Sequence, residues 1–492
     1  MKNITYSIFL SLSFVLAFNE TSNAQTDPDY PNILFIIADD LGKDAINGYL
    51  PIERSPNTPT LDSLRANGLT FDNAWVTPQC TPSRAAIMSG KYGIKTGVRR
   101  APGNLDTVHQ SIFTKIDETT GNAYADALIG KWHISNPSDL NHPVQHGLDH
   151  YEGNFRSSVD DYYSWEKVVN GETIQVNEYA TTHLTNASID WIRAQDKPWF
   201  LWLAHPAPHS PFQLPPDSLF TNPDTSNNQG RYIAMIEAID AETKRLLDNI
   251  PEDELENTLI VFIGDNGTPR GVAQYYPNGQ GKGTLFEAGI CVPLIISGKG
   301  VARKGEREAA LVHGVDFYAT FLEAIGISLQ GGIYNSRSFK HLLECGEGSS
   351  RSFNYTDFIN NGDEGFAIRN SQYKLVKYES GQEEFYDLNN DPLETNNIVT
   401  GLTPEQQTIK QSLEMEANRI RDDWSCNDGI LNGNEVFIDD CNDDCINDNS
   451  TSTENIGCCE VPASVSIFYE YKLVYHVQFI IWQMYNYHIK AA

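Results

Sequence analysis

Residues 32–40 read NILFIIADD, an apolar run rich in β-branched residues that ends in two aspartates. A continuous run of this kind is typical of a strand buried on both faces of a parallel sheet. Similar runs occur at 199–204, 258–263 and 292–296, and helical periodicity appears at 232–250 and 317–325. Apolar strands that alternate with amphipathic helices predict an α/β domain with a large, mostly parallel central sheet flanked by helices. In such sheets ligands bind beyond the carboxyl ends of the strands, so the polar residues there are the first candidates for a site.

The pattern changes after about residue 350. Short alternating segments at 366–369, 373–376 and 384–388 predict antiparallel strands. A helix is expected at 403–421, with Thr403 as its N-cap and a proline at its first position. We therefore predict an α/β domain over residues 25–350 and a smaller α+β subdomain over 351–424.

The two ends of the chain carry other signals. Residues 1–24 are typical of a signal peptide, because Lys2 precedes an apolar run at 8–18 that is too short to span a bilayer. We expect the mature protein to begin after Ala24 and to be exported, either periplasmic or secreted. Five of the eight cysteines crowd into residues 425–460, which in an exported protein indicates a disulfide-stapled appendage. The sequence of residues 461–492 does not indicate a role for this tail, and its scattered polar residues argue against a membrane span.

Composition excludes some classes of protein. Of the 492 residues 40% are hydrophobic, which is enough for a sizeable core. The formal net charge of −30 repels nucleic acid and anionic membranes, so we expect no nucleic-acid partner. An anionic small substrate would need a local cluster of cations to overcome this field.

Carboxylate and amide side chains follow two of the predicted strands. Asp39 and Asp40 end the first, and Asp265 and Asn266 come shortly after the run at 258–263. Either pair alone is more often a turn or a helix cap. On neighbouring strands, however, the four side chains would present hard oxygen ligands, which suit Ca²⁺, with Mg²⁺ as the alternative, better than Zn²⁺.

The segment from residue 80 reads CTPSRAAIMSG. Pro82 fits the first turn of a helix, and Cys80 would lie near the positive end of that helix dipole. A cysteine in such a place, taken alone, is more often buried and inert.

This segment, together with Asp39-Asp40, GKWH at 130–133, His209, DNG at 265–267 and GKGT at 281–284, resembles the formylglycine-dependent sulfatases. The resemblance covers roughly residues 30–400. It implies an alkaline-phosphatase-like core and hydrolysis of sulfate esters. It also implies that a formylglycine-generating or sulfatase-maturing enzyme oxidises Cys80 to an aldehyde.

The resemblance further implies roles for individual residues. The hydrated aldehyde at position 80 would be the nucleophile, and Arg84 would hold it. Lys131 and Lys282 would neutralise charge on the transferred group, His133 would orient the nucleophile, and His209 or Lys282 would protonate the leaving alcohol. The implied metal ligands are Asp39, Asp40, Cys80, Asp265 and Asn266. Arg99 and Arg100 are weaker candidates for binding a second anionic group of the substrate, and a solvated helix-end pair explains them equally well.

Export and acidity favour a sulfated polysaccharide as substrate, with algal glycans such as ulvan or carrageenan as the expected class. Two other functions remain open at this point. A phosphatase or phosphonate monoester hydrolase of the same superfamily would share the metal ligands, and a non-catalytic glycan-binding protein would keep the scaffold without the aldehyde.

Overall fold

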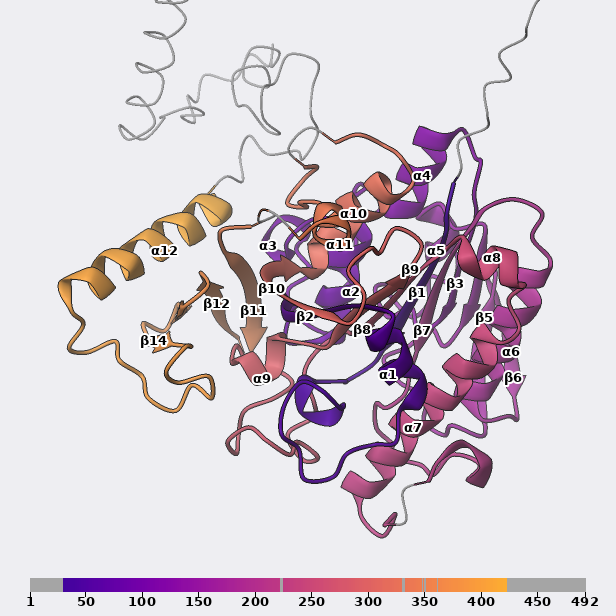
Figure 1. Ribbon diagram of the computed structural model, residues 1–492, viewed down its shortest axis with the longest axis horizontal. Coiled ribbons are helices and arrows are strands. Elements are labelled where there is room, and N and C mark those ends of the chain that lie inside the picture. Colours follow the sequence, from indigo (N-terminus) through magenta and orange to yellow (C-terminus); the bar gives the residue numbers. More distant parts are fainter. Residues whose placement is uncertain are drawn as a thin grey trace, which may run out of the picture.

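The computed structural model describes residues 30–221, 224–329, 332–346, 348, 351–360 and 362–422. The predicted signal peptide, the cysteine-rich segment at 425–460 and the tail at 461–492 lie outside these residues. The described chain forms a ten-stranded sheet flanked by helices and a separate four-stranded sheet (Figure 1). Within those ranges, every helix is too short or too polar to cross a lipid bilayer.

The central strands of the large sheet are three of the apolar runs identified in the sequence. β1 (Asn32–Ala38) lies between β7 (Trp199–His205) and β8 (Thr258–Gly264) and is parallel to both. All residues of these strands are buried, and their carboxyl ends meet, since Ala38 pairs with both His205 and Gly264. The predicted parallel core is confirmed. The full order is β10-β2-β9-β8-β1-β7-β3-β4-β5-β6, with the other strands at Gly68–Trp75 (β2), Ala125–Gly130 (β3), His150–Gly153 (β4), Trp165–Val169 (β5), Glu172–Val176 (β6), Leu294–Gly298 (β9) and Glu306–His313 (β10).

One apolar run has a different direction from the one expected. The segment at 292–296 was predicted to be another parallel strand, but β9 runs antiparallel to both β2 and β8. Its apolar residues are explained by burial between two neighbouring strands, which strands of either direction experience. Hydrophobic content therefore identified a central strand but not its direction.

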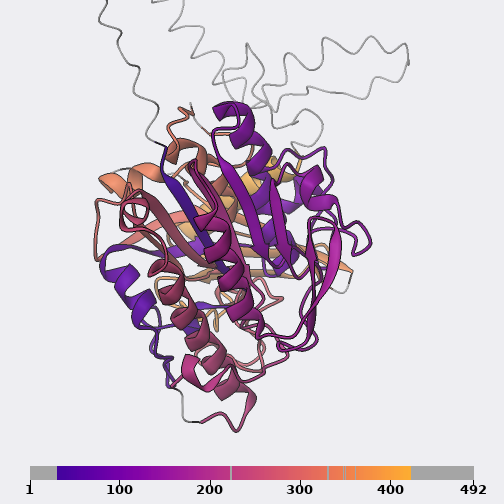
Figure 2. The same cartoon turned by 90° about the vertical axis from the view of Figure 1, so that its right-hand side faces the viewer.

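Helices cover both faces of the large sheet (Figures 1 and 2). One face packs against α2 (Cys80–Ser89), α4 (Ile112–Thr120), α10 (Phe317–Ala324) and α11 (Lys340–Glu344). The other packs against α1 (Pro59–Ala66), α6 (Ala180–Arg193) and α7 (Asn228–Leu247). The predicted helices at 232–250 and 317–325 correspond to α7 and α10. Shorter helices are α3 (Gly93–Thr96), α5 (His142–Gln145), α8 (Glu252–Glu256) and α9 (Glu287–Ile290).

The C-terminal subdomain is an antiparallel sheet covered by one helix. Its strands are β11 (Asn354–Asn360), β12 (Asp363–Arg369), β13 (Tyr373–Tyr378) and β14 (Glu383–Asp387), and α12 (Pro404–Asp422) packs on β12 and β13. Three of these strands and the helix were predicted, and β11 was not. Thr403 caps α12 as expected, because its Oγ1 accepts a hydrogen bond from the Gln406 amide (3.2 Å).

The subdomain shares a hydrophobic cluster with the large domain. Leu375 and Phe385 of the small sheet and Leu413 of α12 pack in one cluster with Ala86 of α2. The small sheet therefore supports the helix whose first residue is Cys80.

Candidate active site

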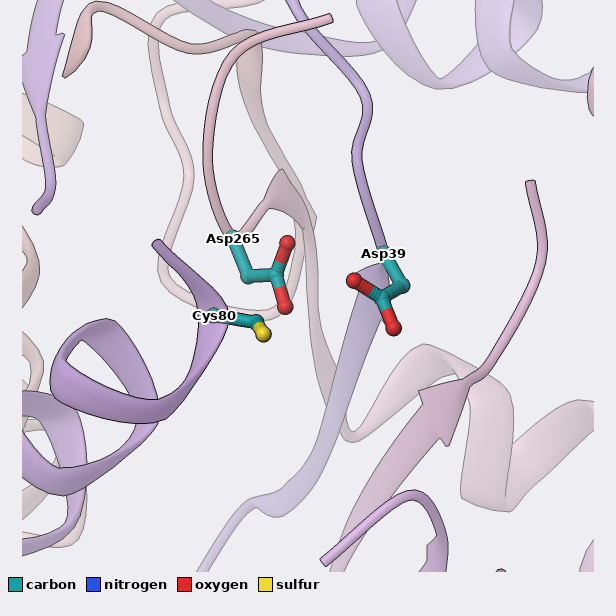
Figure 3. Close-up of side chains that lie close together, drawn as sticks. All are labelled: Asp39, Cys80 and Asp265. Atoms are coloured by element: carbon teal, nitrogen blue, oxygen red, sulfur yellow. The ribbon is translucent and has the colours of Figure 1, made fainter. Parts of the chain in front are cut away.

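Side chains from three distant parts of the chain meet at the carboxyl edge of the large sheet. Asp39 and Asp40 follow β1, Asp265 and Asn266 follow β8, and Cys80 begins α2. The Asp40 amide donates to Asp265 Oδ1 (3.0 Å) across 225 residues of sequence. Ligand atoms of Asp39, Cys80 and Asp265 all lie within 4.8 Å of one another (Figure 3). The structure thus brings together the five residues predicted as metal ligands.

The backbone at Asp40 adopts an unusual conformation. Its φ of 68° lies in the left-handed region, which costs a residue with a side chain on the order of 1 kcal/mol. The conformation is fixed on both sides, because the Tyr232 hydroxyl donates to the Asp40 carbonyl oxygen (2.7 Å) while the Asp40 amide is bound by Asp265. Strain that is held in this way is common at functional sites.

Each carboxylate of the cluster has its own cation. Lys131 pairs with Asp39 Oδ2, Lys282 Nζ lies 2.5 Å from Asp40 Oδ1, and Arg84 donates to Asp265 Oδ2 through Nε (3.0 Å) and Nη2 (2.7 Å). Burial disfavours the charged amine of Lys282, but Asp40 outweighs it and raises the pKa of Lys282 above its usual value. The three carboxylates are therefore balanced by three cations.

Two buried oxygens of the cluster remain unpaired. Asp39 Oδ1 and Asn266 Oδ1 accept no hydrogen bond from any residue in the described part of the chain. Buried polar atoms are rarely left in this state. Burial, and next to it the charge of Asp39, raises the pKa of Asp265. A hard divalent cation would satisfy the free oxygens and stabilise the paired carboxylates, so the residues fit the predicted metal.

Cys80 is buried beside two side chains that could orient its sulfur or a group derived from it. It is 3% exposed, and its Sγ lies 3.4 Å from His133 Nδ1. The hydroxyl of Thr81 lies 3.2 Å from the same ring nitrogen. Burial raises the pKa of the Cys80 thiol, so the thiol stays protonated and is a poor nucleophile in this environment. Burial, with Lys131 as the next cause, lowers the pKa of His133 and keeps its ring neutral.

Arg84 and His209 both lie at the site but differ in their contacts. Arg84 was expected to hold the group at residue 80, whereas its guanidinium binds Asp265 and the Lys131 carbonyl oxygen (2.9 Å). His209 Nε2 lies 3.7 Å from Asp40 Oδ2, and its side chain is partly exposed. His209 is held by its backbone, because its carbonyl oxygen accepts a hydrogen bond from the Tyr162 hydroxyl (2.8 Å). It occupies the solvent side of the cluster.

Comparison with protein families identifies this arrangement. The sulfatase family model matches residues 31–327, which include all of the side chains described above. The chain belongs to the sulfatase family. A second model, described as N-sulphoglucosamine sulphohydrolase, C-terminal, matches residues 280–423.

Curated sulfatases and solved structures resemble the chain over much of its length. Arylsulfatase J of Mus musculus is 30% identical over 317 residues, covering 59% of this chain and 52% of its own. An arylsulfatase of Clostridium perfringens is 26% identical over 457 residues, which cover 75% of this chain and 90% of the arylsulfatase. The crystal structure of Ps i-CgsB in complex with k-i-k-neocarrahexaose matches with a TM-score of 0.68 and 25% identity. The match covers 82% of this chain and 94% of the Ps i-CgsB chain. The chain spans about half the length of arylsulfatase J.

One of the two arginines predicted to bind substrate is engaged elsewhere in this member of the sulfatase family. Arg99 is 7% exposed, and its guanidinium pairs with Asp357 of β11 (2.5 Å) and with Glu364 of β12. Arg99 joins the large domain to the subdomain, and two carboxylates already balance its charge, which makes it a poor candidate for binding a substrate anion. Arg100 is exposed and precedes Ala101, whose amide donates to Gln79 Oε1 (2.8 Å). Arg100 thus remains close to the start of α2.

Sequence reasoning missed four residues that position the sulfatase site. Tyr162 fixes the backbone of His209 and Tyr232 fixes that of Asp40. Tyr162 lies in a polar turn and Tyr232 in a helix, and neither tyrosine carries a sequence signal of such a role. Gln280 binds the subdomain two residues before Lys282, and no local pattern indicates this partner. Thr81 could have been noticed, because it lies within the CTPSR segment itself.

Proposed function

We propose that this protein is an exported sulfatase that hydrolyses sulfate esters of a sulfated polysaccharide, or of its oligosaccharides, to an alcohol and inorganic sulfate. The observation that carries the proposal is the convergence of Asp39, Cys80 and Asp265 within 4.8 Å, at the residues predicted for metal and nucleophile. The sulfatase family model spans these positions.

Charge explains how so acidic a chain would accept an anionic ester. The overall charge of −30 repels sulfate at long range. In the cluster, however, Lys131, Lys282 and Arg84 already balance the three carboxylates. A divalent cation added to this balanced set gives the site a positive excess exactly where a sulfate group would bind, and little solvent is present to screen it.

The cation would be held by Asp39, Asp40, Asp265, Asn266 and the group at residue 80. Ca²⁺ is proposed, with Mg²⁺ as the alternative, because the protein ligands are oxygens. When bound, the cation would supply charge neutralisation on the sulfate oxygens. Lys131 and Lys282 would add to this neutralisation from fixed positions, which requires no rearrangement during the reaction.

The nucleophile is proposed to be a hydrated aldehyde formed from Cys80 by a maturing enzyme. Such a group would offer a hydroxyl in place of a thiol that burial keeps protonated. His133 and Thr81 would hold that hydroxyl by hydrogen bonds. His209 lies on the solvent side of the cluster, where a leaving alcohol would depart, and is the proposed proton donor.

The substrate class rests on one solved relative. Ps i-CgsB, at 25% identity, was solved with k-i-k-neocarrahexaose, a carbohydrate ligand. A sulfated glycan of this general type, such as an algal carrageenan or ulvan fragment, is therefore proposed here.

The test compares turnover of p-nitrophenyl sulfate and p-nitrophenyl phosphate by protein whose residue 80 has been characterised by peptide mass spectrometry. The proposal expects an aldehyde at residue 80 and a higher kcat/KM for the sulfate ester. Preferred hydrolysis of the phosphate would indicate the phosphatase alternative. An unmodified thiol in protein from the native host, together with glycan binding and no turnover, would indicate a non-catalytic binding protein.

A further inference from the structure

A cavity of about 490 Å³ lies beside the catalytic cluster. Its lining comes from residues 137–140, from 154–160 and from the β5–β6 hairpin. Two of these segments flank His133 directly. The first follows it in sequence by a few residues, and the second pairs with it, since the His133 amide donates to the Phe155 carbonyl oxygen (3.3 Å). The backbone of residues 154–155, which lines the cavity, therefore lies beside the backbone of His133, whose side chain contacts Cys80. The volume of the cavity is in the range that holds small ligands.

The cavity presents a cation without a protein partner. Arg156 lines it and is exposed. Across the ranges that the structure describes, its guanidinium makes no hydrogen bond or ion pair to another residue, in contrast to Arg84 and Arg99. A free guanidinium can bind a sulfate or carboxylate group through two parallel hydrogen bonds.

A buried acceptor belongs to the lining of the same cavity. Asn154 lines the same cavity and is only 2% exposed. Its amide nitrogen donates to the Arg156 carbonyl oxygen (3.2 Å), whereas its Oδ1 has no hydrogen-bond donor among the described residues. A buried acceptor that lacks a donor is costly, and a ligand hydroxyl would satisfy it.

We propose that this cavity is the subsite for the sugar unit adjoining the one that carries the scissile sulfate, and that it selects a unit with an anionic substituent. Arg156 binds the sulfate or carboxylate of that neighbouring unit, and Asn154 Oδ1 accepts a hydrogen bond from one of its hydroxyl groups. This inference rests on the proposed function and deepens it, since it makes an oligosaccharide with two anionic groups the preferred substrate.

The charges around the cavity limit how many anions it accepts. Asp160 and Glu166 belong to the same lining and are exposed. They repel a ligand with several anionic groups, so the subsite suits a unit with one such group, placed at Arg156. A simple aryl sulfate has no second unit and gains nothing from the cavity.

The test measures binding and turnover separately. Arg156→Gln is combined with Cys80→Ala, and affinities are measured by calorimetry for three sulfated disaccharides whose neighbouring sugar carries a second sulfate, a carboxylate or neither. Arg156→Gln is expected to weaken binding of the second-sulfate or the carboxylate disaccharide about 10-fold or more, and that of the neutral one less than about twofold. The more strongly affected of the two anionic ligands identifies the substituent that the subsite prefers.

The matched control is Arg193→Gln, which removes the same charge from an exposed position on α6. It should leave all three affinities unchanged. Turnover of p-nitrophenyl sulfate by Arg193→Gln in the otherwise unchanged enzyme should equal that of the parent. Equal effects of Arg156→Gln on all three disaccharides, or no effect on either anionic one, would overturn the subsite. Absence of aryl sulfate turnover in the parent would instead contradict the proposed sulfatase activity.

Discussion

The side-chain amide of Gln280 donates a hydrogen bond to the carbonyl oxygen of Leu393 (2.9 Å), which ties the C-terminal subdomain to the loop that carries Lys282. The other side of the same loop is also fixed, because the Gly283 amide donates to the Pro78 carbonyl oxygen (2.8 Å), two residues before Cys80. Lys282 thus lies between two attachments, one to the subdomain and one to the start of α2. The subdomain therefore helps to position Lys282, whose amine is proposed to take part in catalysis.

Gln280→Ala should therefore lower kcat by about 2- to 10-fold, the size expected for loss of one hydrogen bond that holds the loop. In a Lys282→Met background the same substitution should have no further effect, because the loop then has no amine to position. Steady-state kinetics of the two single variants and the double variant measure this coupling. Independent, multiplicative effects would show that Gln280 acts on something other than Lys282.

Cys80→Ala should lower kcat by at least about 10³-fold while changing the free energy of unfolding by about 1 kcal/mol or less. The side chain is at the first position of α2 and loses only one atom in this substitution. Cys291→Ala is the matched control, because Cys291 is also buried but lies outside the catalytic cluster. Residual activity of Cys80→Ala near the parent level would refute its role as precursor of the nucleophile.

Arg84→Met should reduce the free energy of unfolding by about 3–5 kcal/mol, because it leaves the Asp265 carboxylate buried without its cation. Arg419→Met removes an exposed arginine that pairs with the partly buried Glu416 on α12, and it should change the free energy of unfolding by about 0.5 kcal/mol or less. Denaturant titrations of both variants give the two values. Equal small changes would mean that Asp265 does not depend on Arg84 for stability.

Chelation of divalent cations should lower both turnover and Tm. Adding Ca²⁺ back at a hundredfold excess over its Kd should restore about 2.7 kcal/mol of stability. Asn266→Leu removes one of the free oxygens without changing charge, and its stability should respond to Ca²⁺ less than that of the parent. Thermal melts with and without the ion make the comparison. A parent protein whose Tm ignores Ca²⁺ and Mg²⁺ alike would contradict the proposed site.

Stability should fall in acid partly through His205. Burial lowers its pKa from 6.5 to about 3, and neither ring nitrogen finds a hydrogen-bond partner in the described chain. Between these two pH values the unfolded state binds a proton that the folded state does not, so stability is lost as the pH falls through this window, at up to about 1.4 kcal/mol per pH unit.

His205→Leu removes this titration, and the slope of unfolding free energy against pH should become shallower than in the parent between pH 6.5 and 3. Urea titrations at several pH values measure both slopes. His133 and His313 are also buried with lowered pKa values and titrate in both proteins, so only the difference between the slopes reports on His205. Identical slopes would contradict a neutral, buried His205.

The sequence was sufficient for the parts of the fold and site that depend on local pattern. The runs that became β1, β7 and β8 are apolar enough to be recognised alone, and parallel strands bring Asp39 and Asp265 to one edge. The direction of β9 was predicted wrongly, and the protein partners of Arg99 were not predicted. Both depend on contacts between segments far apart in the chain. The β5–β6 hairpin and its cavity were not predicted, since β6 is mostly exposed and a short strand of this kind resembles an ordinary loop.

The burial of Cys80 has a consequence for the proposed oxidation of its side chain. In the finished fold the residue is almost sealed from solvent, and the groups that enclose it, Asp265 and Lys282 among them, are synthesised long after it. An enzyme that oxidises this side chain could reach it while the nascent polypeptide is still incomplete or has not yet collapsed. Oxidation of Cys80 would then have to take place before the chain finishes folding. A molecule that folded first would keep an unmodified thiol at residue 80.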